Sequence, residues 1–229
     1  MFNKKAVFVV TIALFLGSIQ VFAGDTATFV DLGFSPDGRI YMFGQYGVQS
    51  GTLRPWADLF VVDVEQNNFV ANGRLSYVHT SPVTAGQTGS GALHRLIAQN
   101  ASLAERHHVD YSFQGLPLFL SIDNNEDTIT FRDFDSGASY QASLVSFVEG
   151  TGNSLRSSFF INLERTDRNN TRRTYTVGTP QLRRPLIASY RIQRVMVSPR
   201  DASLIFVIEM RRLEGDSFSI RYMVEAVRL

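Results

Sequence analysis

Most of the chain after residue 24 alternates apolar and polar residues in short runs that end at turn-forming residues. A period of two is typical of antiparallel strands with one buried face. The pattern predicts a mainly β fold, α+β by strict count, built as an antiparallel meander. About twelve runs, in three loose groups of four, predict strands: Ala27–Phe34, Arg39–Tyr46, Ala57–Val64, Phe69–His79, Pro117–Ile122, Thr128–Phe134, Ser139–Val148, Leu155–Glu164, Arg173–Val177, Ile187–Val197, Ser203–Met210 and Ser217–Val227.

One segment has a different period. Between Gly91 and His107 the apolar residues recur at helical spacing, and Ser90 is available as the N-cap. We expect one amphipathic helix around residues 91–107, packed on a sheet face. No Pro-rich or Ser-rich linker divides the chain, so residues 24–229 are predicted to form a single domain.

Two segments repeat each other weakly. Phe34–Phe43, which contains Ser35-Pro36-Asp37-Gly38, resembles Val197–Phe206, and each is followed by a polar loop and an apolar strand. The first copy resembles the blade repeat of TolB-type propellers. Three groups of four strands are too few for a closed propeller, so the prediction is a sandwich or an open propeller-like assembly of sheets.

The first 23 residues have the order of an export signal. Lys4 and Lys5 precede the apolar run Ala6–Leu16, and Val21-Phe22-Ala23 fits the small-residue pattern before a cleavage site. We expect a cleavable signal peptide at residues 1–23, cleavage between Ala23 and Gly24, and a mature chain that is secreted or periplasmic. The run is short for a membrane anchor, so no stable membrane insertion of the mature chain is expected.

Composition excludes several chemistries. Both lysines lie in the leader, and the remaining 20 basic residues, all arginine, oppose 21 acidic residues, which leaves a formal net charge of −1 without the leader. This balance gives no electrostatic argument for nucleic acid binding. Without Lys or Cys the mature chain has no phosphate-loop lysine, Schiff base, thiol nucleophile or disulfide.

Taken together, several segments resemble a family of predicted secreted bacterial proteins known as domain of unknown function 2259. The residues that carry the resemblance are the leader, Phe34–Gly38 with Leu59–Val64, the helix at Ala92–Glu105, and Ile220–Glu225. The resemblance implies a secreted, single-domain, β-rich protein and carries over no catalytic residue. The TolB-type repeat implies protein binding, by analogy of fold alone.

Two groups of residues are candidates for binding. Trp56, the only tryptophan, follows Arg54 in a loop rich in Gly, where an aromatic side chain anchors a ligand or folds back over the sheet end. Arg165, Arg168, Arg172 and Arg173 gather around a predicted hairpin, with Arg183 and Arg184 ten residues further on. Arginine pairs carboxylates in bidentate fashion, so this group either forms a solvated turn or docks an acidic partner or an anionic glycan.

Other patterns are incomplete. His107 and His108 are adjacent, so on a helix they point about 100° apart. Asp123–Asp127 resembles the first half of a calcium loop, but Thr128 and Phe134 occupy the places of its Gly and Glu. Gly86–Gly91 lacks a phosphate-loop lysine. We therefore predict no catalytic residue, no metal site and no cofactor.

The resulting functional prediction is an exported, non-enzymatic binding or structural protein whose partner is an envelope or extracellular protein. One alternative is a carbohydrate-active or other hydrolase that assembles Asp58, Asp63, Asp133 and Asp135 from separate strands. The second alternative is an outer-membrane β-barrel, which about twelve strands and export would allow. Arg221 and Glu225 in the last strand argue against it, because charge is costly on a lipid-facing stripe.

Overall fold

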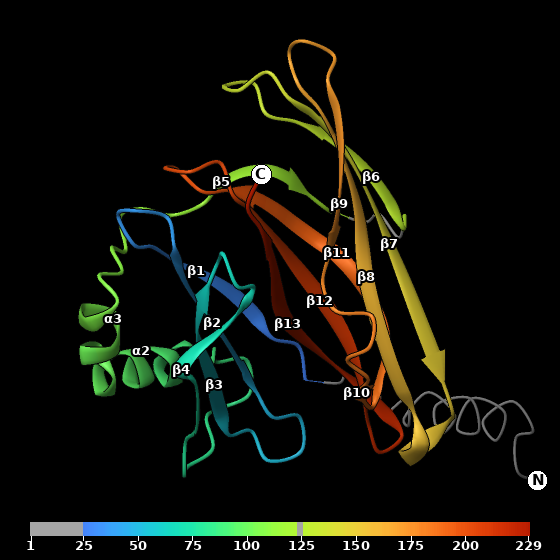
Figure 1. Ribbon diagram of the computed structural model, residues 1–229. Helices are drawn as coiled ribbons and strands as arrows, with labels where there is room; N and C mark the ends of the chain where they lie inside the picture. The colour runs from blue at the N-terminus through green and yellow to red at the C-terminus, as the bar shows by residue number, and fades with distance from the viewer. Residues whose placement is uncertain (1–24, 123–125) are drawn as a thin grey trace, which may run out of the picture.

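The computed structural model describes residues 25–122 and 126–229. The predicted signal peptide, its cleavage site at Ala23–Gly24 and three residues of the Asp123–Asp127 loop lie outside the described residues. The described chain forms three antiparallel sheets and two short helices (Figure 1), which confirms the mainly β fold.

The first four strands form a meander, here called the N-terminal sheet, in the order β1-β2-β3-β4. Its strands are β1 (Thr28–Phe34), β2 (Ile40–Val48), β3 (Pro55–Asp63) and β4 (Asn68–Val78). The turn between β1 and β2 is closed by backbone hydrogen bonds from Ser35 N to Ile40 O (2.9 Å) and from Gly38 N to Ser35 O (2.9 Å). Gly38 has a φ of +74°, which a side chain would strain, so the predicted turn chemistry is present.

The last three long strands and β5 form the central sheet, in the order β13-β12-β11-β5. They are β5 (Leu116–Leu120), β11 (Ile187–Val197), β12 (Leu204–Glu214) and β13 (Ser217–Val227). The β11–β12 turn, which includes Ser198 and Asp201, is the second copy of the weak repeat. It packs directly on the first, because a Cβ on Gly38 would lie 2.9 Å from both Ser198 and Asp201. The two similar turns therefore hold the N-terminal and central sheets together at one end.

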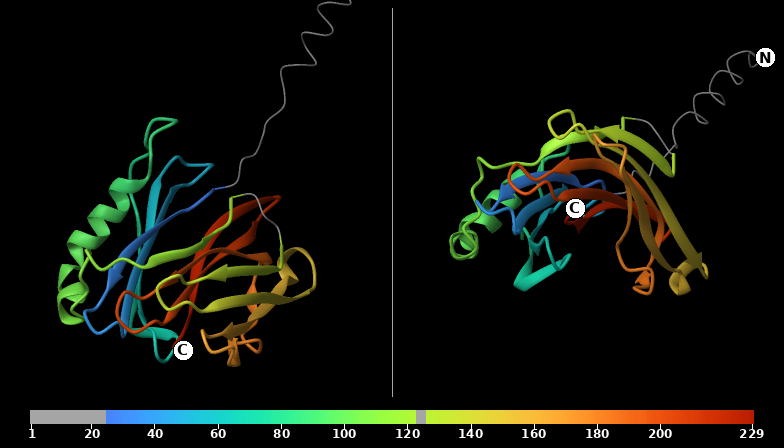
Figure 2. Two further views of the ribbon diagram at one scale, coloured as in Figure 1. Left: turned by 90° about the horizontal axis from the view of Figure 1, so that it is seen from above. Right: turned by 45° about the horizontal axis from the view of Figure 1, so that its top comes forward.

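The remaining strands form the outer sheet, in the order β10-β8-β7-β6 with β9 paired to β8. They are β6 (Thr128–Arg132), β7 (Ser139–Glu149), β8 (Arg156–Thr166), β9 (Arg172–Val177) and the two-residue β10 (Arg184–Pro185), and the short 3-10 helix η1 (Gly152–Ser154) precedes β8. The outer sheet curves around one face of the central sheet (Figure 2).

The predicted single helix is wrong, because two helices occupy its place: α2 (Ser90–Gln99) and α3 (Ala101–Arg106). Asn100 separates them with a φ of −124°. Its side chain donates a hydrogen bond to the Leu96 carbonyl (2.8 Å). Such local side-chain bonds of asparagine compete with the backbone hydrogen bonds that would continue the helix. Gly89, and not Ser90, is the N-cap of α2.

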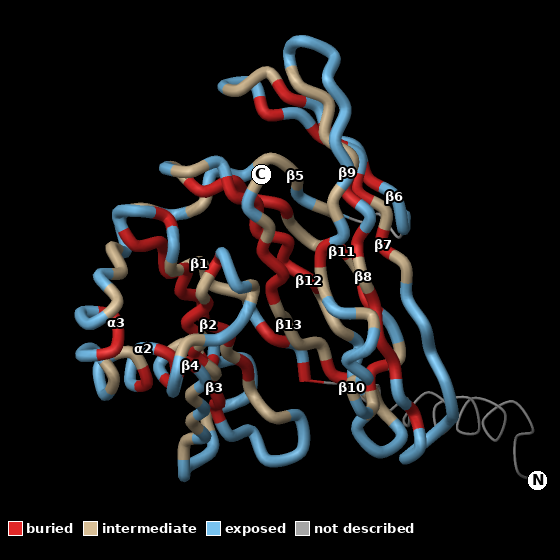
Figure 3. Tube along the Cα trace, in the orientation of Figure 1, coloured by how far each residue is buried: buried red, intermediate tan, exposed pale blue. Residues whose placement is uncertain are grey.

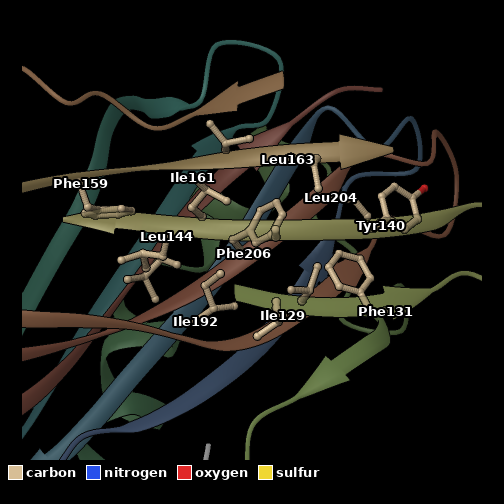
Figure 4. Packing of buried hydrophobic residues seen from close by; sticks show 14 of the residues in the cluster. Ile129, Phe131, Tyr140, Leu144, Phe159, Ile161, Leu163, Ile192, Leu204 and Phe206 are labelled. Carbon is tan, nitrogen blue, oxygen red and sulfur yellow. The ribbon is translucent and has the colours of Figure 1, made fainter. Parts of the chain in front are cut away.

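The elements stack in four layers: helices, N-terminal sheet, central sheet and outer sheet (Figure 1). Leu93, Leu96 and Leu103 of the helices pack on Leu59 and Val61. Apolar residues of β2 and β3 meet one face of the central sheet, among them Tyr41, Phe43 and Val62. On the other face, Ile192, Leu204 and Phe206 meet the outer-sheet residues Ile129, Phe131, Tyr140, Leu144, Phe159, Ile161 and Leu163 (Figure 4). Buried residues accordingly lie along the strands at which neighbouring sheets face each other (Figure 3).

One buried polar contact joins all three sheets. Glu225 of β13 accepts a hydrogen bond from the Asn67 side chain (2.5 Å), and its carboxylate lies 3.3 Å from the Arg184 guanidinium of β10. The Asn67 side-chain oxygen also accepts from Ala226 N (2.6 Å), and Arg184 lies over the Phe159 ring (4.9 Å). Burial raises the pKa of Glu225, while Asn67 and Arg184 act in the opposite direction.

The core between the central and outer sheets predicts a large cost of truncation. Phe206 is fully buried between them, so Phe206→Ala is expected to lower the free energy of unfolding by about 3–5 kcal/mol. Phe147, which is half exposed, is the matched control, and Phe147→Ala is expected to cost less than about 1 kcal/mol. Urea unfolding of the three proteins measures both values, and equal costs would contradict the assigned core.

The raised pKa of Glu225 predicts a specific pH dependence. The folded state holds this proton more tightly than the unfolded chain, so the stability it contributes is complete below the ordinary pKa of 4.5 and is lost as pH rises through the folded value. Glu225→Gln removes this contribution. The free energy of unfolding is measured against pH for the unsubstituted protein and for Glu225→Gln, and the difference between the two slopes gives the contribution of Glu225. Identical slopes would contradict the raised pKa of this carboxyl group.

Candidate functional site

The face of the central sheet that meets the N-terminal sheet changes character along its strands. In β12 the alternating residues Ile205 and Val207 are fully buried, whereas the next two on that face, Glu209 and Arg211, are charged. Arg191 of β11 lies directly opposite Glu209 in the sheet register. The apolar cover of the N-terminal sheet therefore ends near Val207, and a polar surface begins there.

This surface is the floor of a groove of about 810 Å³ that extends to the edge of the outer sheet. We call it the central groove. Its lining residues come from the segment before β1, from the outer sheet with the loop before β6, and from the central sheet: Thr26, Glu126, Asp127, Leu144, Ser189, Tyr190, Arg191, Ile192, Glu209, Arg211, Asp216, Ser217, Phe218 and Ile220.

A polar network lies at the floor of the groove. Arg191 makes an ion pair of 2.8 Å with Glu209, and Glu209 also accepts a hydrogen bond of 3.4 Å from the Tyr222 hydroxyl. Burial, followed by the charge of Glu209, raises the pKa of Tyr222 to about 12. The Arg191 Nε atom is buried and has no hydrogen-bond partner among the described residues. The pair is thus fixed in orientation and retains an unused donor.

Arg211, Asp127 and Asp216 are further charged side chains of the groove. Arg211 is exposed and lies 4.0 Å from the centre of the Phe218 ring, a cation–π contact that orients its guanidinium. Asp127 and Asp216 also line the groove, and neither carboxylate has an ion-pair partner within the described ranges. The groove therefore offers separate positive and negative groups beside an aromatic ring.

The groove also borders an incomplete strand edge. β5 pairs with β11 only at residues 194–197, with one more hydrogen bond from Ser121 N to Gln193 O. From Ser189 to Ile192 this edge has no partner strand in the part of the chain that the structure describes. Backbone donors and acceptors at such an edge are the groups to which an extended peptide adds.

The structure places the predicted aromatic anchor elsewhere. Trp56 lies within β3 and not in a loop, and it is only 5% exposed. The Arg221 guanidinium covers its ring at 4.1 Å. Arg54 lies just before β3 and is exposed. Ligand binding by Arg54 and Trp56 stays a prediction, and the protein itself covers Trp56.

The predicted arginine group is divided between the two ends of the outer sheet. Arg165 and Arg173 lie directly opposite each other near the β8–β9 turn, and Arg168 reaches the Asp135 carbonyl in the β6–β7 turn. Arg172 makes an ion pair with Glu164 (3.1 Å). Arg183 pairs with Glu149 (2.5 Å), and Arg184 with Glu225; both belong to the opposite end of β8. Four of the six arginines therefore lie near the β8–β9 turn and two at the opposite end of β8, and binding by this group stays a prediction.

The four aspartates of the hydrolase alternative do not share a hollow. Asp58 accepts hydrogen bonds from Gln45 (3.0 Å) and Ser76 (2.7 Å) within the N-terminal sheet. Asp63 accepts from Gln66 N (2.9 Å), while Asp133 is buried in the β6–β7 turn, which Asp135 continues. The carboxylates that do converge are Glu126, Asp127, Glu209 and Asp216 of the central groove.

The histidine pair lies in a separate hollow of about 410 Å³ at the end of α3, beside Asp37 and Asp63. Among residues 25–122 and 126–229, no three His, Asp or Glu side chains are placed to share a metal ion. The Gly86–Gly91 segment leads into α2, whose N-cap makes no side-chain hydrogen bond. None of the described helices has the length and apolar character needed to cross a bilayer.

The groove residues were missed because their significance depends on contacts between distant strands. One local signal was present: in Leu204–Arg211 the alternating positions change from Ile205 and Val207 to Glu209 and Arg211. A strand that is apolar on both faces and then becomes charged on one face marks the point at which its cover ends.

The polar network predicts a change in tyrosine ionisation. In Glu209→Gln the negative charge beside Tyr222 is lost, so the pKa of Tyr222 is expected to fall, while burial keeps it above the ordinary value of 10. Tyrosinate absorbance, measured while circular dichroism shows the protein to be folded, follows the change. Tyr222→Phe in the Glu209→Gln background identifies the signal, and an unchanged titration in Glu209→Gln would contradict the contact.

Comparison with known proteins gives one match. A family described as "Predicted secreted protein (DUF2259)" matches residues 42–228, which is most of the chain. The match does not confirm the resemblance to the TolB-type repeat, which stays a prediction. No curated protein and no solved structure was found to be similar to the chain.

Proposed function

Because the chain belongs to the DUF2259 family of predicted secreted proteins, we propose that it is an exported binding protein whose central groove holds an extended segment of a partner polypeptide. The observation that carries this proposal is the change from apolar to charged residues on one face of β12, beside the incomplete edge of β11. We place its action outside the cytoplasm, in the periplasm or at the cell exterior.

The chemistry of the groove favours a polypeptide. The β11 edge supplies backbone hydrogen bonds to any extended segment, which gives affinity without sequence preference. Arg211, Asp127 and Asp216 supply charges of both signs that select the partner's side chains. Phe218 provides a flat apolar surface next to Arg211. Such a segment would continue the central sheet beyond β11.

The hydrolase remains the second candidate, supported by the carboxylates of Asp127, Glu209 and Asp216 in one groove. Glu209 is engaged by Arg191 and Tyr222, which suits orientation of a bound ligand more than proton transfer. Turnover of a polysaccharide that depends on Asp127 and Asp216 would favour this candidate over simple binding.

Site-specific photo-crosslinking tests the binding proposal. A photoreactive amino acid at Ser189, exposed at the groove, is expected to give a discrete adduct with an envelope protein, whereas one at Ala98, exposed on α2, is not. Arg211→Glu is expected to reduce the Ser189 adduct at least several-fold. Arg212→Glu is the matched control, because Arg212 is the adjacent, exposed residue outside the groove.

The comparison of the two arginine variants makes the result specific. Equal loss in Arg211→Glu and Arg212→Glu would indicate a general charge effect and contradict the groove. Adducts of the same identity from Ser189 and Ala98, or none from Ser189, would also contradict it.

A further inference from the structure

The outer sheet has one face that packs on the central sheet and another that points away from it. Alternate residues of a strand point to opposite faces of a sheet. In β7, Tyr140, Ala142 and Leu144 are buried in the core, so the residues between them point outward. The elements of the described chain that pack on the outer sheet are strands of the central sheet (Figure 2). They leave the outward face uncovered.

The outward face carries a regular array of hydroxyl and amide side chains, here called the outer polar face. Two rows lie across β6, β7, β8 and β9 in the sheet register: Thr130, Gln141, Glu164 and Thr174 in one, and Thr128, Ser143, Asn162 and Thr176 in the next. All eight residues are exposed or half-buried, and only Glu164 is charged. The sheet backbone therefore holds these polar groups at regular spacing toward water.

The charge and the hydrogen bonds of the outer polar face identify the ligand chemistry that it fits. Arg172 neutralises Glu164 in an ion pair of 3.1 Å. The side chains of Gln141, Asn162 and Thr174 make no hydrogen bond to another part of the described chain. Their donors and acceptors match a ligand that is rich in uncharged polar groups. A charged ligand would leave its own charge without a counter-charge here.

The outer polar face is hollowed along its rows. One hollow of about 440 Å³ is lined by residues of β6, β7 and β8, and another of about 300 Å³ by residues of β7, β8 and β9. Both hollows include Gln141 and Glu164, so together they cross all four strands. Since neighbouring strands lie about 4.8 Å apart, the four strands span about 14 Å. This length fits a chain of linked units better than a single small molecule.

The same face continues into an aromatic platform formed by Phe147 and Phe160. Both rings lie at outward positions, because they alternate in register with Ser143 and Asn162. The ring centres are 6.2 Å apart and the ring planes are inclined by only 24°. Phe147 is 51% exposed. The face of an aromatic ring is electron-rich and attracts C–H groups that carry partial positive charge, such as those on the flat side of a sugar ring.

We propose that the outward face of the outer sheet binds an uncharged polysaccharide in an extended conformation. Sugar hydroxyls donate and accept hydrogen bonds, as do the threonine hydroxyls and the amides of Gln141 and Asn162. Phe147 and Phe160 stack on the flat side of a sugar ring beyond these rows. The site lies on the opposite face of the outer sheet from Leu144, which lines the central groove, so the inference does not depend on the proposed function.

Calorimetric titration of the protein with cellohexaose and chitohexaose, two uncharged and extended oligosaccharides, tests the proposal. At least one of them is expected to bind. Hexagalacturonate, which carries a carboxylate on every sugar, is expected to bind more weakly, because the outer polar face offers that charge no partner. Stronger binding of hexagalacturonate would overturn the proposal, since it would indicate binding by the arginines near the β8–β9 turn.

Two variants with matched controls locate the site. Phe147→Ala and Gln141→Ala are each expected to weaken binding about three- to tenfold, through loss of a stacking contact or a hydrogen bond. The controls are Phe134→Ala, since Phe134 is 82% exposed in the β6–β7 turn, and Gln99→Ala, since Gln99 is exposed on α2. Both controls are expected to bind as the unsubstituted protein does. Equal affinity in each variant and its control would contradict the assigned face.

Absence of binding by both uncharged hexasaccharides would also overturn the proposal. A photoreactive amino acid at Thr174, exposed on the outer polar face, then identifies any other occupant. A discrete protein adduct from this position would assign the face to a protein partner in place of a polysaccharide.

Discussion

The structure depends on the burial of β12 on both of its faces. Five consecutive residues, from Leu204 to Ile208, are fully buried, so successive side chains point into two different cores. Such a strand is stable only if a layer covers each face of its sheet, and the N-terminal and outer sheets provide these layers. The contact of Asn67, Glu225 and Arg184 lies where all three sheets meet. Its buried charge is costly by itself, but it fixes the order and the alignment of the layers.

The central groove follows from the same requirement. Beyond Ile208, β12 becomes charged on the face that the N-terminal sheet no longer covers, and Glu209 and Arg211 meet water in the groove. At the β13 edge the segment from Asp25 to Ala27 supplies a partner, whereas no described strand pairs with β11 between Ser189 and Ile192. The proposed partner segment therefore concerns the edge of the central sheet that the described chain leaves unpaired.

Much of the fold could be predicted because strand patterns and turns are local. The alternation predicted nearly every strand, and the turn at Ser35–Gly38 has the expected hydrogen bonds. The two-residue β10 carries no alternation, and the helix break at Asn100 depends on one side-chain bond, so both were missed. The central groove was harder to predict, because the residues that line it come from strands that are far apart in the sequence. Arg184, unlike Arg168, makes a buried contact with Glu225, 41 residues away, and composition cannot reveal that.

The pairing of β5 with β11 has a consequence for how the chain folds and varies. These neighbouring strands of the central sheet are separated in sequence by the whole outer sheet, from β6 to β10. The outer sheet is thus a long insertion between β5 and β11, two strands that are neighbours in the central sheet. Joining those ends requires closure of a loop of more than sixty residues, an entropic cost that grows only slowly with length. Insertions within the hairpins of the outer sheet would therefore enlarge that sheet with little effect on the remaining layers. A chain that ended before β11 would leave β5 without its partner strand.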